Sequence, residues 1–242
     1  MANRHFNVLV AGVNHPSLMD KYDSNRMVEK YVAFEYAKAE EYRKKFLEGL
    51  EEAAKYNPSV QENIDFIKNE DIDDFYLDLT EEYEYDPETG NAISTKNPDG
   101  KFDSYRIAGN FAMPFVLKNG KEAYSALKGD IDWEKMNADP TPYETAWDLV
   151  VGGKKPKNDY EKNIYENMKN RTAYFGAFGS KSDYVTMSTA FWCYAFVSDK
   201  NGWTEFGHSD NQVEWVKNFY KKFVKNLPDS TLLTLYECTR EP

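Results

Sequence analysis

The sequence predicts an α+β fold with a single mixed or antiparallel sheet and two main helices on one face, a ferredoxin-like core with large insertions. Two observations lead to this class. Runs of β-branched and aromatic residues stand near both ends of the chain and in its middle, and two segments repeat apolar residues at helical spacing. The 242 residues are 41% hydrophobic and 16% aromatic, which is enough to bury a core. We therefore expect residues 1–242 to form a single domain.

The first half of the chain supplies one strand, one helix and one irregular strand. His5–Gly12 is short, rich in β-formers and ends at glycine, so it predicts a buried strand. Val28–Leu50 repeats apolar residues at helical spacing with Glu and Lys between them, which predicts an amphipathic helix. Phe102–Lys118 is aromatic and β-branched but is broken by Gly109 and Pro114, as in an edge strand or a bulge.

The second half of the chain supplies a hairpin, a helix and a last strand. Tyr184–Val197 has the strongest strand pattern in the sequence, and a turn leads from it into a hairpin that ends at Phe206. Ser209–Gln212 has the S-x-x-Q form of a capping box, and the apolar spacing after it predicts a helix over 213–227. We expect four strands to share one sheet: His5–Gly12, Phe102–Lys118, Tyr184–Val197 and Thr231–Cys238.

Two insertions interrupt this core, an acidic one at about residues 59–100 and a loop-rich one at about 120–182. The net charge is −11, and Ser59–Glu88 alone holds twelve acids and one base. An ordered segment of this kind would present carboxylates in rows that mimic the phosphates of DNA and would bind a basic partner protein. The alternative is an insertion that is only solvated. The residues that we assign to protein interaction are Asp71, Asp73, Asp74 and Asp78.

The composition excludes several classes of function. The net charge repels phosphates, so we expect no non-specific nucleic-acid binding. Two cysteines are too few for a disulfide framework, and the three histidines have no zinc-ligand spacing. No apolar run approaches 18 residues, and Met1–Gly12 lacks the features of a secretory signal. We therefore expect a cytoplasmic protein with no membrane partner.

One pair of carboxylates is a candidate metal site. Asp130 and Asp132 stand two residues apart on a turn, a spacing that holds a hard divalent cation when other oxygens converge on it. The alternative is that Asp132 caps a helix that begins at Trp133. No Ser/His/Asp or Cys/His arrangement follows from the spacing of residues. Apart from a divalent cation at this pair, we expect no cofactor.

Four stretches of the sequence carry a recognisable pattern. They are His5–Gly12 with Leu18–Tyr22, Asp86–Gly90 with Asn97–Phe111, Lys128–Trp133, and Leu227–Cys238. Together they resemble a family of uncharacterised proteins encoded by tailed bacteriophages. The second stretch is similar to the central signature of that family, N-P-x-x-K-W-D-W-Y-x-[IL]-G-G-R-W. The resemblance implies a phage origin and one integrated domain, and it implies no activity.

The central signature supplies most of the candidate ligand-binding residues. Where the family has Gly-Gly-Arg-Trp, this chain has Ala-Gly-Asn-Phe at 108–111, so the anion-binding role of that arginine is not transferred. The residues that we assign to ligand binding are Tyr105, Arg106, Gly109, Asn110 and Phe111, with Trp192 and Trp203 as further aromatic platforms. The alternative is a bulged strand in which Gly109 permits a close backbone approach.

These observations favour a phage accessory protein that acts by binding. Its partner is a host protein or a small nucleotide-like ligand in the host cytoplasm, and its setting is counter-defence or host takeover. The alternatives are a small metal-dependent hydrolase or nuclease that uses Asp130 and Asp132, and a structural component of the virion. The sequence does not predict the oligomeric state.

Overall fold

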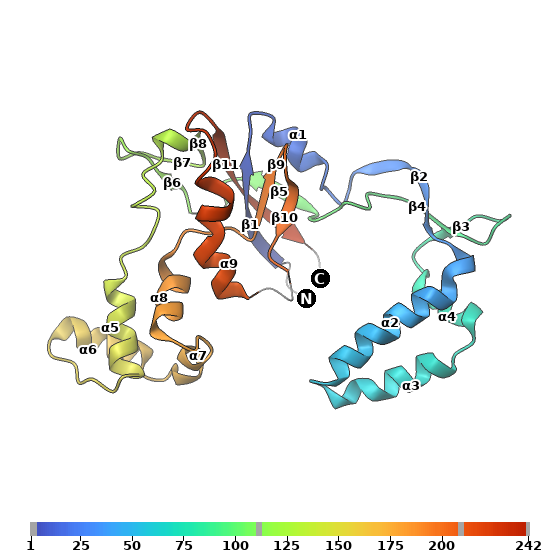
Figure 1. Ribbon diagram of the computed structural model, residues 1–242, viewed down its shortest axis with the longest axis horizontal. Helices are drawn as coiled ribbons and strands as arrows, with labels where there is room; N and C mark the ends of the chain where they lie inside the picture. Colours follow the sequence, from blue (N-terminus) through green and yellow to red (C-terminus); the bar gives the residue numbers. More distant parts are fainter. Residues whose placement is uncertain (1–3, 110–112, 208–210, 241–242) are drawn as a thin grey trace. The chain divides into compact units, whose positions relative to one another are not determined.

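The computed structural model describes residues 4–109, 113–207 and 211–240. Helices and strands are both present, so the α+β class is confirmed. The chain divides into two compact units: unit 1 is Met1–Ser24 with Asp99–Pro242, and unit 2 is Asn25–Pro98. Each unit has its own sheet (Figure 1). The expectation that the whole chain forms a single domain stays a prediction.

Unit 1 is built on a six-stranded mixed sheet in the order β10-β9-β1-β11-β5, with β8 beside the other half of β11. Its strands are β1 (Arg4–Ala11), β5 (Ser104–Ile107), β8 (Ser125–Leu127), β9 (Ala195–Ser198), β10 (Gly202–Glu205) and β11 (Leu232–Arg240). The two terminal strands β1 and β11 pair antiparallel along their full length, and β9 runs parallel to β1. The prediction that both ends of the chain join one sheet is therefore confirmed.

The two faces of this sheet are covered by different helices. Val8 and Val10 of β1 pack with residues of α1 (His15–Asp20), while Leu9 and Ala11 pack with residues of α9 (Gln212–Phe219). We call these the α1 face and the α9 face. A π-helical turn, η4 (Tyr220–Val224), continues α9 along the sheet (Figure 1). The arrangement differs from the prediction of two main helices on one face, and a ferredoxin-like core is not confirmed.

Two predicted strands of unit 1 are shorter than the sequence suggests. Phe102–Lys118 splits into β5 and β6 (Phe115–Val116), because Ala108 and Gly109 both have positive φ and turn the chain. The strand predicted over Tyr184–Val197 is wrong for most of its length. Residues 181–189 form a helix, and β9 begins only at Ala195. The other short elements are β7 (Glu122–Ala123), which pairs with β6, and η3 (Lys128–Asp130).

The predicted loop-rich insertion contains helices with a hydrophobic cluster of their own. Its helices are α5 (Thr141–Val150), α6 (Asp159–Met168), α7 (Thr172–Gly176) and α8 (Lys181–Thr189). They gather around the buried side chains of Ala146, Phe175 and Tyr184, which form a cluster separate from those on the sheet. Residues 120–182 therefore contain packed helices as well as loops, α8 lies mostly beyond them, and the extent of the insertion stays a prediction.

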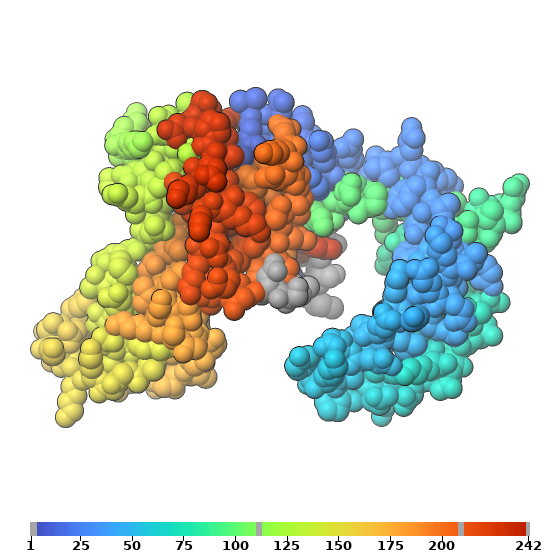
Figure 2. Space-filling view, viewed as in Figure 1, coloured from blue at the N-terminus to red at the C-terminus, as the bar shows by residue number. Residues whose placement is uncertain are grey.

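Unit 2 combines a three-stranded sheet with three helices. Its elements are β2 (Met27–Phe34), η1 (Tyr36–Lys38), α2 (Ala39–Ala54), η2 (Pro58–Val60), α3 (Gln61–Asn69), α4 (Ile72–Leu79), β3 (Glu84–Tyr85) and β4 (Ala92–Lys96). The helix predicted from Val28 therefore begins at Ala39, and residues 28–34 lie in β2 instead. Helices α2 and α3 pack side by side (Figure 2). Tyr76 joins helix to sheet, since its hydroxyl donates to Phe34 O and accepts from Ala92 N.

Candidate functional site

A pocket of about 380 Å³ opens in unit 1 at the end of the sheet where β1 begins and β11 ends. We call it the end pocket. Its lining residues are Arg4, His5, Phe6, Lys101, Tyr194, Glu205, Phe206, Gly207 and Arg240. This set combines three Lys or Arg side chains and three aromatic rings with a single carboxylate. Its volume falls within the range of sites for small organic ligands.

Two arginines face each other across the central strand pair at this pocket. Arg4 of β1 lies directly opposite Arg240 of β11, and both are exposed. Like charges opposite each other on neighbouring strands destabilise a sheet. Among the described residues, neither guanidinium lies within ion-pair distance of a carboxylate. An anion bound between the two guanidinium groups would relieve this repulsion.

Three aromatic rings form a continuous wall beside the arginines. The ring centroids of Phe6 and Tyr194 are 4.9 Å apart, and those of Tyr194 and Phe206 are 6.5 Å apart. Burial and the Glu205 carboxylate raise the pKa of Tyr194, while the charges of Arg240 and Arg4 oppose that rise. The Tyr194 hydroxyl therefore stays protonated at neutral pH, close to both guanidinium groups.

The acid in the pocket is held by its neighbours. Glu205 pairs with Lys101 Nζ at 3.4 Å, and its other oxygen accepts a hydrogen bond from Trp203 Nε1 at 2.8 Å. Lys101 is thus partly neutralised, whereas Arg4 and Arg240 keep their charge for a ligand. Guanidinium groups beside aromatic faces match a molecule that carries both an anionic group and a planar ring.

The predicted residues Arg106 and Gly109 lie around a different group, the buried carboxylate of Glu237. Arg106 is directly opposite Glu237 on the neighbouring strand and donates to it from Nη2 at 2.8 Å. His5 Nδ1 lies 2.7 Å from the other oxygen of the same carboxylate. Gly109 packs directly against the Glu237 side chain. These contacts give Arg106 and Gly109 a structural role in the sheet.

The other predicted ligand-binding residues do not converge on one site. Tyr105 alternates with Arg106 and so lies on the α1 face, where its ring packs on Phe102 and its hydroxyl donates to Asp20. Trp203 packs on that face too, against Tyr22 and Phe102. Trp192 packs against the core of the α9 face. Asn110 and Phe111 lie outside the described residues.

The candidate metal residues have other partners. Asp132 pairs with Lys135 at 2.7 Å, and the Lys135 side chain lowers the pKa of this carboxyl. Asp132 also accepts from the Lys135 backbone N–H, so it caps the turn that follows it. Asp130 is exposed, and its carbonyl accepts from Lys118 N. In the part of the chain that the structure describes, no three His, Cys, Asp or Glu side chains are grouped to hold a metal ion.

The predicted protein-interaction residues all lie on or next to α4 in unit 2. Asp71 is the N-cap of α4 and accepts from Asp73 N at 2.9 Å. The Asp73 carboxylate accepts from the Tyr36 hydroxyl. Asp74 and Asp78 are exposed and stand one turn apart on the same side of the helix. Three of the four carboxylates, at positions 71, 74 and 78, therefore share one face.

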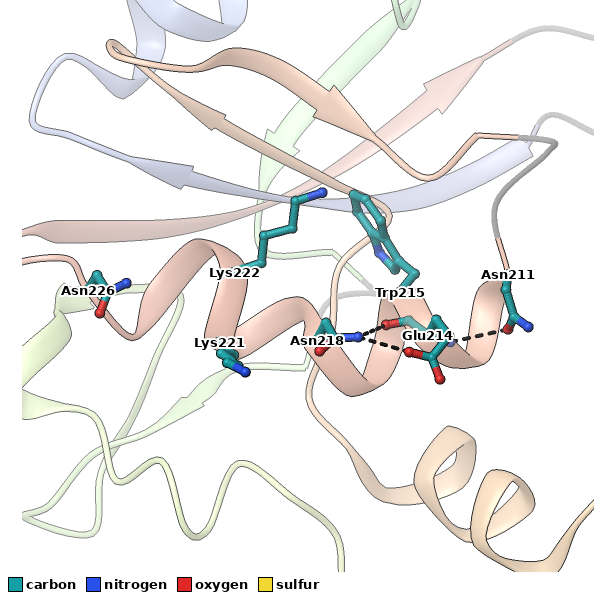
Figure 3. A pocket seen from close by; sticks show the side chains of 7 residues that line it. All are labelled: Asn211, Glu214, Trp215, Asn218, Lys221, Lys222 and Asn226. Carbon is teal, nitrogen blue, oxygen red and sulfur yellow. Dashed lines mark hydrogen bonds between the residues drawn. The ribbon is translucent and has the colours of Figure 1, made fainter.

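A larger hollow lies along α9, but its lining does not form a site. It measures about 580 Å³ and is lined mainly by residues of one helix (Figure 3). Lys221 and Lys222 point in different directions, and Lys222 lies over the ring of Trp215 at 5.5 Å from its centroid (Figure 3). Asn218 is engaged with Glu214 of the preceding turn. Asn211, Glu214 and Asn218 are thus bonded to one another, and the two lysines do not converge on a common point.

Sequence reasoning did not identify the residues of the end pocket. Arg4 precedes the first predicted strand and Arg240 follows the last one, and neither position carries a motif. A usable signal exists all the same. Once the two terminal strands are paired antiparallel, the start of the first strand and the end of the last lie at the same end of the sheet, and the register decides whether their basic residues stand opposite each other. Tyr194 lies inside Tyr184–Val197, which the sequence predicts as one continuous strand. Its position at the pocket was therefore not predicted.

No family model, curated protein or solved structure matches this chain. Within residues 4–109, 113–207 and 211–240, no helix is long and apolar enough to cross a membrane. The function must therefore be argued from the geometry of the chain itself.

Proposed function

We propose that this protein acts by binding a small nucleotide-like anion in the end pocket. One observation carries the proposal: Arg4 and Arg240 face each other beside a wall of three aromatic rings, with no carboxylate at ion-pair distance among the described residues. A phosphate group accepts paired hydrogen bonds from guanidinium groups in a fixed geometry. A planar base stacks on Tyr194 or Phe206.

The setting that we propose follows the resemblance to proteins of tailed phages. An accessory protein that sequesters a nucleotide signal in the cytoplasm of the infected cell would interfere with host defence. Binding alone is sufficient for this role, so it requires no cofactor.

Isothermal titration with the full chain tests the ligand class. The probes are AMP, adenosine, which lacks the phosphate, and ribose 5-phosphate, which lacks the base. We expect AMP to bind and each fragment to bind at least about tenfold more weakly, since each loses one of the two kinds of contact. No heat of binding from any nucleoside monophosphate at concentrations up to about 1 mM would overturn the proposal.

Two variants test the site. Arg4→Gln with Arg240→Gln removes both charges and should weaken AMP binding at least about tenfold, because hydrogen bonds to charged groups are the strong ones. Arg171→Gln removes an exposed arginine of unit 1 outside the pocket and should leave the affinity unchanged. Equal affinities for the two variants would show that AMP binds elsewhere.

A further inference from the structure

Unit 2 contains an apolar groove between its three helices. The groove has a volume of about 430 Å³ and lies within residues 46–79. Its lining residues are Phe46 and Leu50 of α2, Asn63, Phe66 and Ile67 of α3, Glu70, and Phe75, Asp78 and Leu79 of α4. Six of these nine side chains are apolar. We call this feature the helical groove.

The groove exposes two aromatic side chains that lie outside the buried core of the unit. Phe66 of α3 is 64% exposed, although Ile64 of the same helix is buried. Phe46 of α2 is 46% exposed. The Phe46 ring lies 6.2 Å from that of the buried Phe75, so the exposed rings are continuous with the interior of the unit. Covering these two phenylalanines with an apolar partner surface would remove them from water and so favour binding.

The rim of the groove is acidic. Glu70 and Asp78 line it, and Asp74 stands one turn before Asp78. Among the described residues, no Lys, Arg or His lies within ion-pair distance of Asp74 or Asp78. Burial and the charges of Asp78 and Asp74 raise the pKa of the Glu70 carboxyl, although Arg43 opposes this. The Arg43 guanidinium is itself paired with Glu40.

We infer that the helical groove docks a basic amphipathic helix of a partner protein. The apolar face of that helix would cover Phe46 and Phe66, and its Lys or Arg side chains would reach Asp74 and Asp78. An apolar groove that takes helix residues at i, i+3, i+4 and i+7 is a recurrent mode of peptide recognition. The charge of the rim selects the basic class of helix, because an acidic helix would meet like charges.

The spacing of the carboxylates favours a basic helix as the partner over the DNA-binding groove of a protein, which a DNA mimic would occupy. Along the axis of α4, Asp71 and Asp74 are about 4.5 Å apart, and Asp74 and Asp78 are about 6 Å apart. The phosphates of duplex DNA are denser, at about one charge per 3.4 Å of axis on each strand. A DNA mimic would also have no use for an exposed apolar floor. The inference shares no residue with the end pocket, so either proposal can fail alone.

Fluorescence anisotropy with designed peptides tests the groove. The probe is a labelled Leu/Lys peptide of about 15 residues with leucines at helical spacing. Its controls are a scrambled peptide of the same composition and a Leu/Glu peptide of the same pattern. With the full chain we expect the patterned Leu/Lys peptide to bind at least about tenfold more tightly than the scrambled one, because only an amphipathic helix presents a continuous apolar face. The Leu/Glu peptide should not bind.

Matched variants locate the binding surface. Phe66→Ser should weaken binding of the patterned peptide at least about tenfold, whereas Tyr56→Ser, at a position that is 85% exposed and outside the groove, should not. Asp74→Asn with Asp78→Asn should weaken binding and reduce its salt dependence. Glu81→Gln with Glu88→Gln makes the same change in net charge at two exposed positions outside the groove lining and should have the smaller effect.

Three outcomes would overturn the inference. They are equal binding of the patterned and scrambled peptides, no effect of Phe66→Ser, and equal effects of the two pairs of acidic substitutions. If binding depends on the acids but not on Phe66, the surface recognises basic charge alone, as a DNA mimic would. Circular dichroism of each variant verifies that the chain keeps its helix content. The substituted side chains are exposed, so replacing them should not unfold unit 2.

Discussion

At the scale of single residues, Glu237 shows how one buried charge constrains its neighbours. Its side chain is 2% exposed, and a buried carboxylate is stable only when it is paired and hydrogen-bonded. Arg106 and His5 supply the partners from the strands on either side. Gly109 supplies the space, because a Cβ atom at this position would stand 1.6 Å from Glu237 Oε2. The close approach that the sequence offered as its alternative for Gly109 is confirmed.

Gly109→Ala should therefore lower the free energy of unfolding by more than about 2 kcal/mol. Gly109 has φ +108°, which strains any residue with a Cβ, and the added methyl group overpacks the space beside Glu237. Urea unfolding measures the change. Gly120→Ala is the control, since Gly120 has φ +80° but open space around it, and about 1 kcal/mol is expected there. Equal losses for the two variants would contradict the steric argument.

At the scale of elements, α8 shows how a local signal can override a strand-like composition. The segment from Tyr184 is rich in β-branched and aromatic residues, which predicts a strand. Just before it, Ser180 Oγ accepts a hydrogen bond from Asp183 N, and the Asp183 carboxylate pairs with Lys217 of α9 at 2.8 Å. Ser180 is thus the N-cap of α8, a local signal that starts a helix. Tyr184 then packs against Phe175 at 4.8 Å between ring centroids, which holds the helix in place.

Ser180→Ala should lower the free energy of unfolding by about 1 kcal/mol and speed hydrogen exchange in the first turn of α8. The reason is that the mutation leaves a helix N–H group without its side-chain acceptor. Ser182→Ala, two residues later and exposed, lacks the cap contact and serves as the control. Hydrogen exchange followed by mass spectrometry reports both. Faster exchange in the Ser182 variant than in the Ser180 variant would show that Ser180 is not the cap.

Elements that depend on distant pairing were the ones the sequence could not predict. The apolar residues of β2 also fit a helical spacing, and β2 is a strand because Val32 pairs with Ile93 of β4, far along the chain. Strand β1, helix α9 with its continuation η4, and strand β11 carry strong local patterns and were predicted within a few residues. The end pocket needed a register, Arg4 opposite Arg240, that no local pattern contains. The predicted site residue Arg106 instead pairs with Glu237, a carboxylate whose burial no sequence pattern indicates.

At the scale of the whole molecule, the charge is concentrated in one unit. Unit 2 holds nine Lys and Arg against nineteen Asp and Glu, so it carries −10 of the net −11, and unit 1 is close to neutral. Local ion pairs along α2, such as Glu41 with Lys45 and Glu52 with Lys55, offset part of this charge. The acids of α4 have fewer such partners. Unit 2 is therefore the part of the chain in which self-repulsion opposes folding.

Salt should consequently stabilise unit 2 and leave unit 1 nearly unchanged. Raising NaCl from about 10 mM to about 300 mM shortens the Debye length from about 30 Å to less than 10 Å, which screens repulsion across the unit. The same salt weakens each exposed ion pair by only a few tenths of a kcal/mol. Hydrogen exchange of the full chain measures both units in one sample. We expect slower exchange in α3 and α4 at high salt, with β1 and β11 as the internal reference. Faster exchange in α3 and α4 at high salt would show that ion pairs, and not net charge, govern the stability of unit 2.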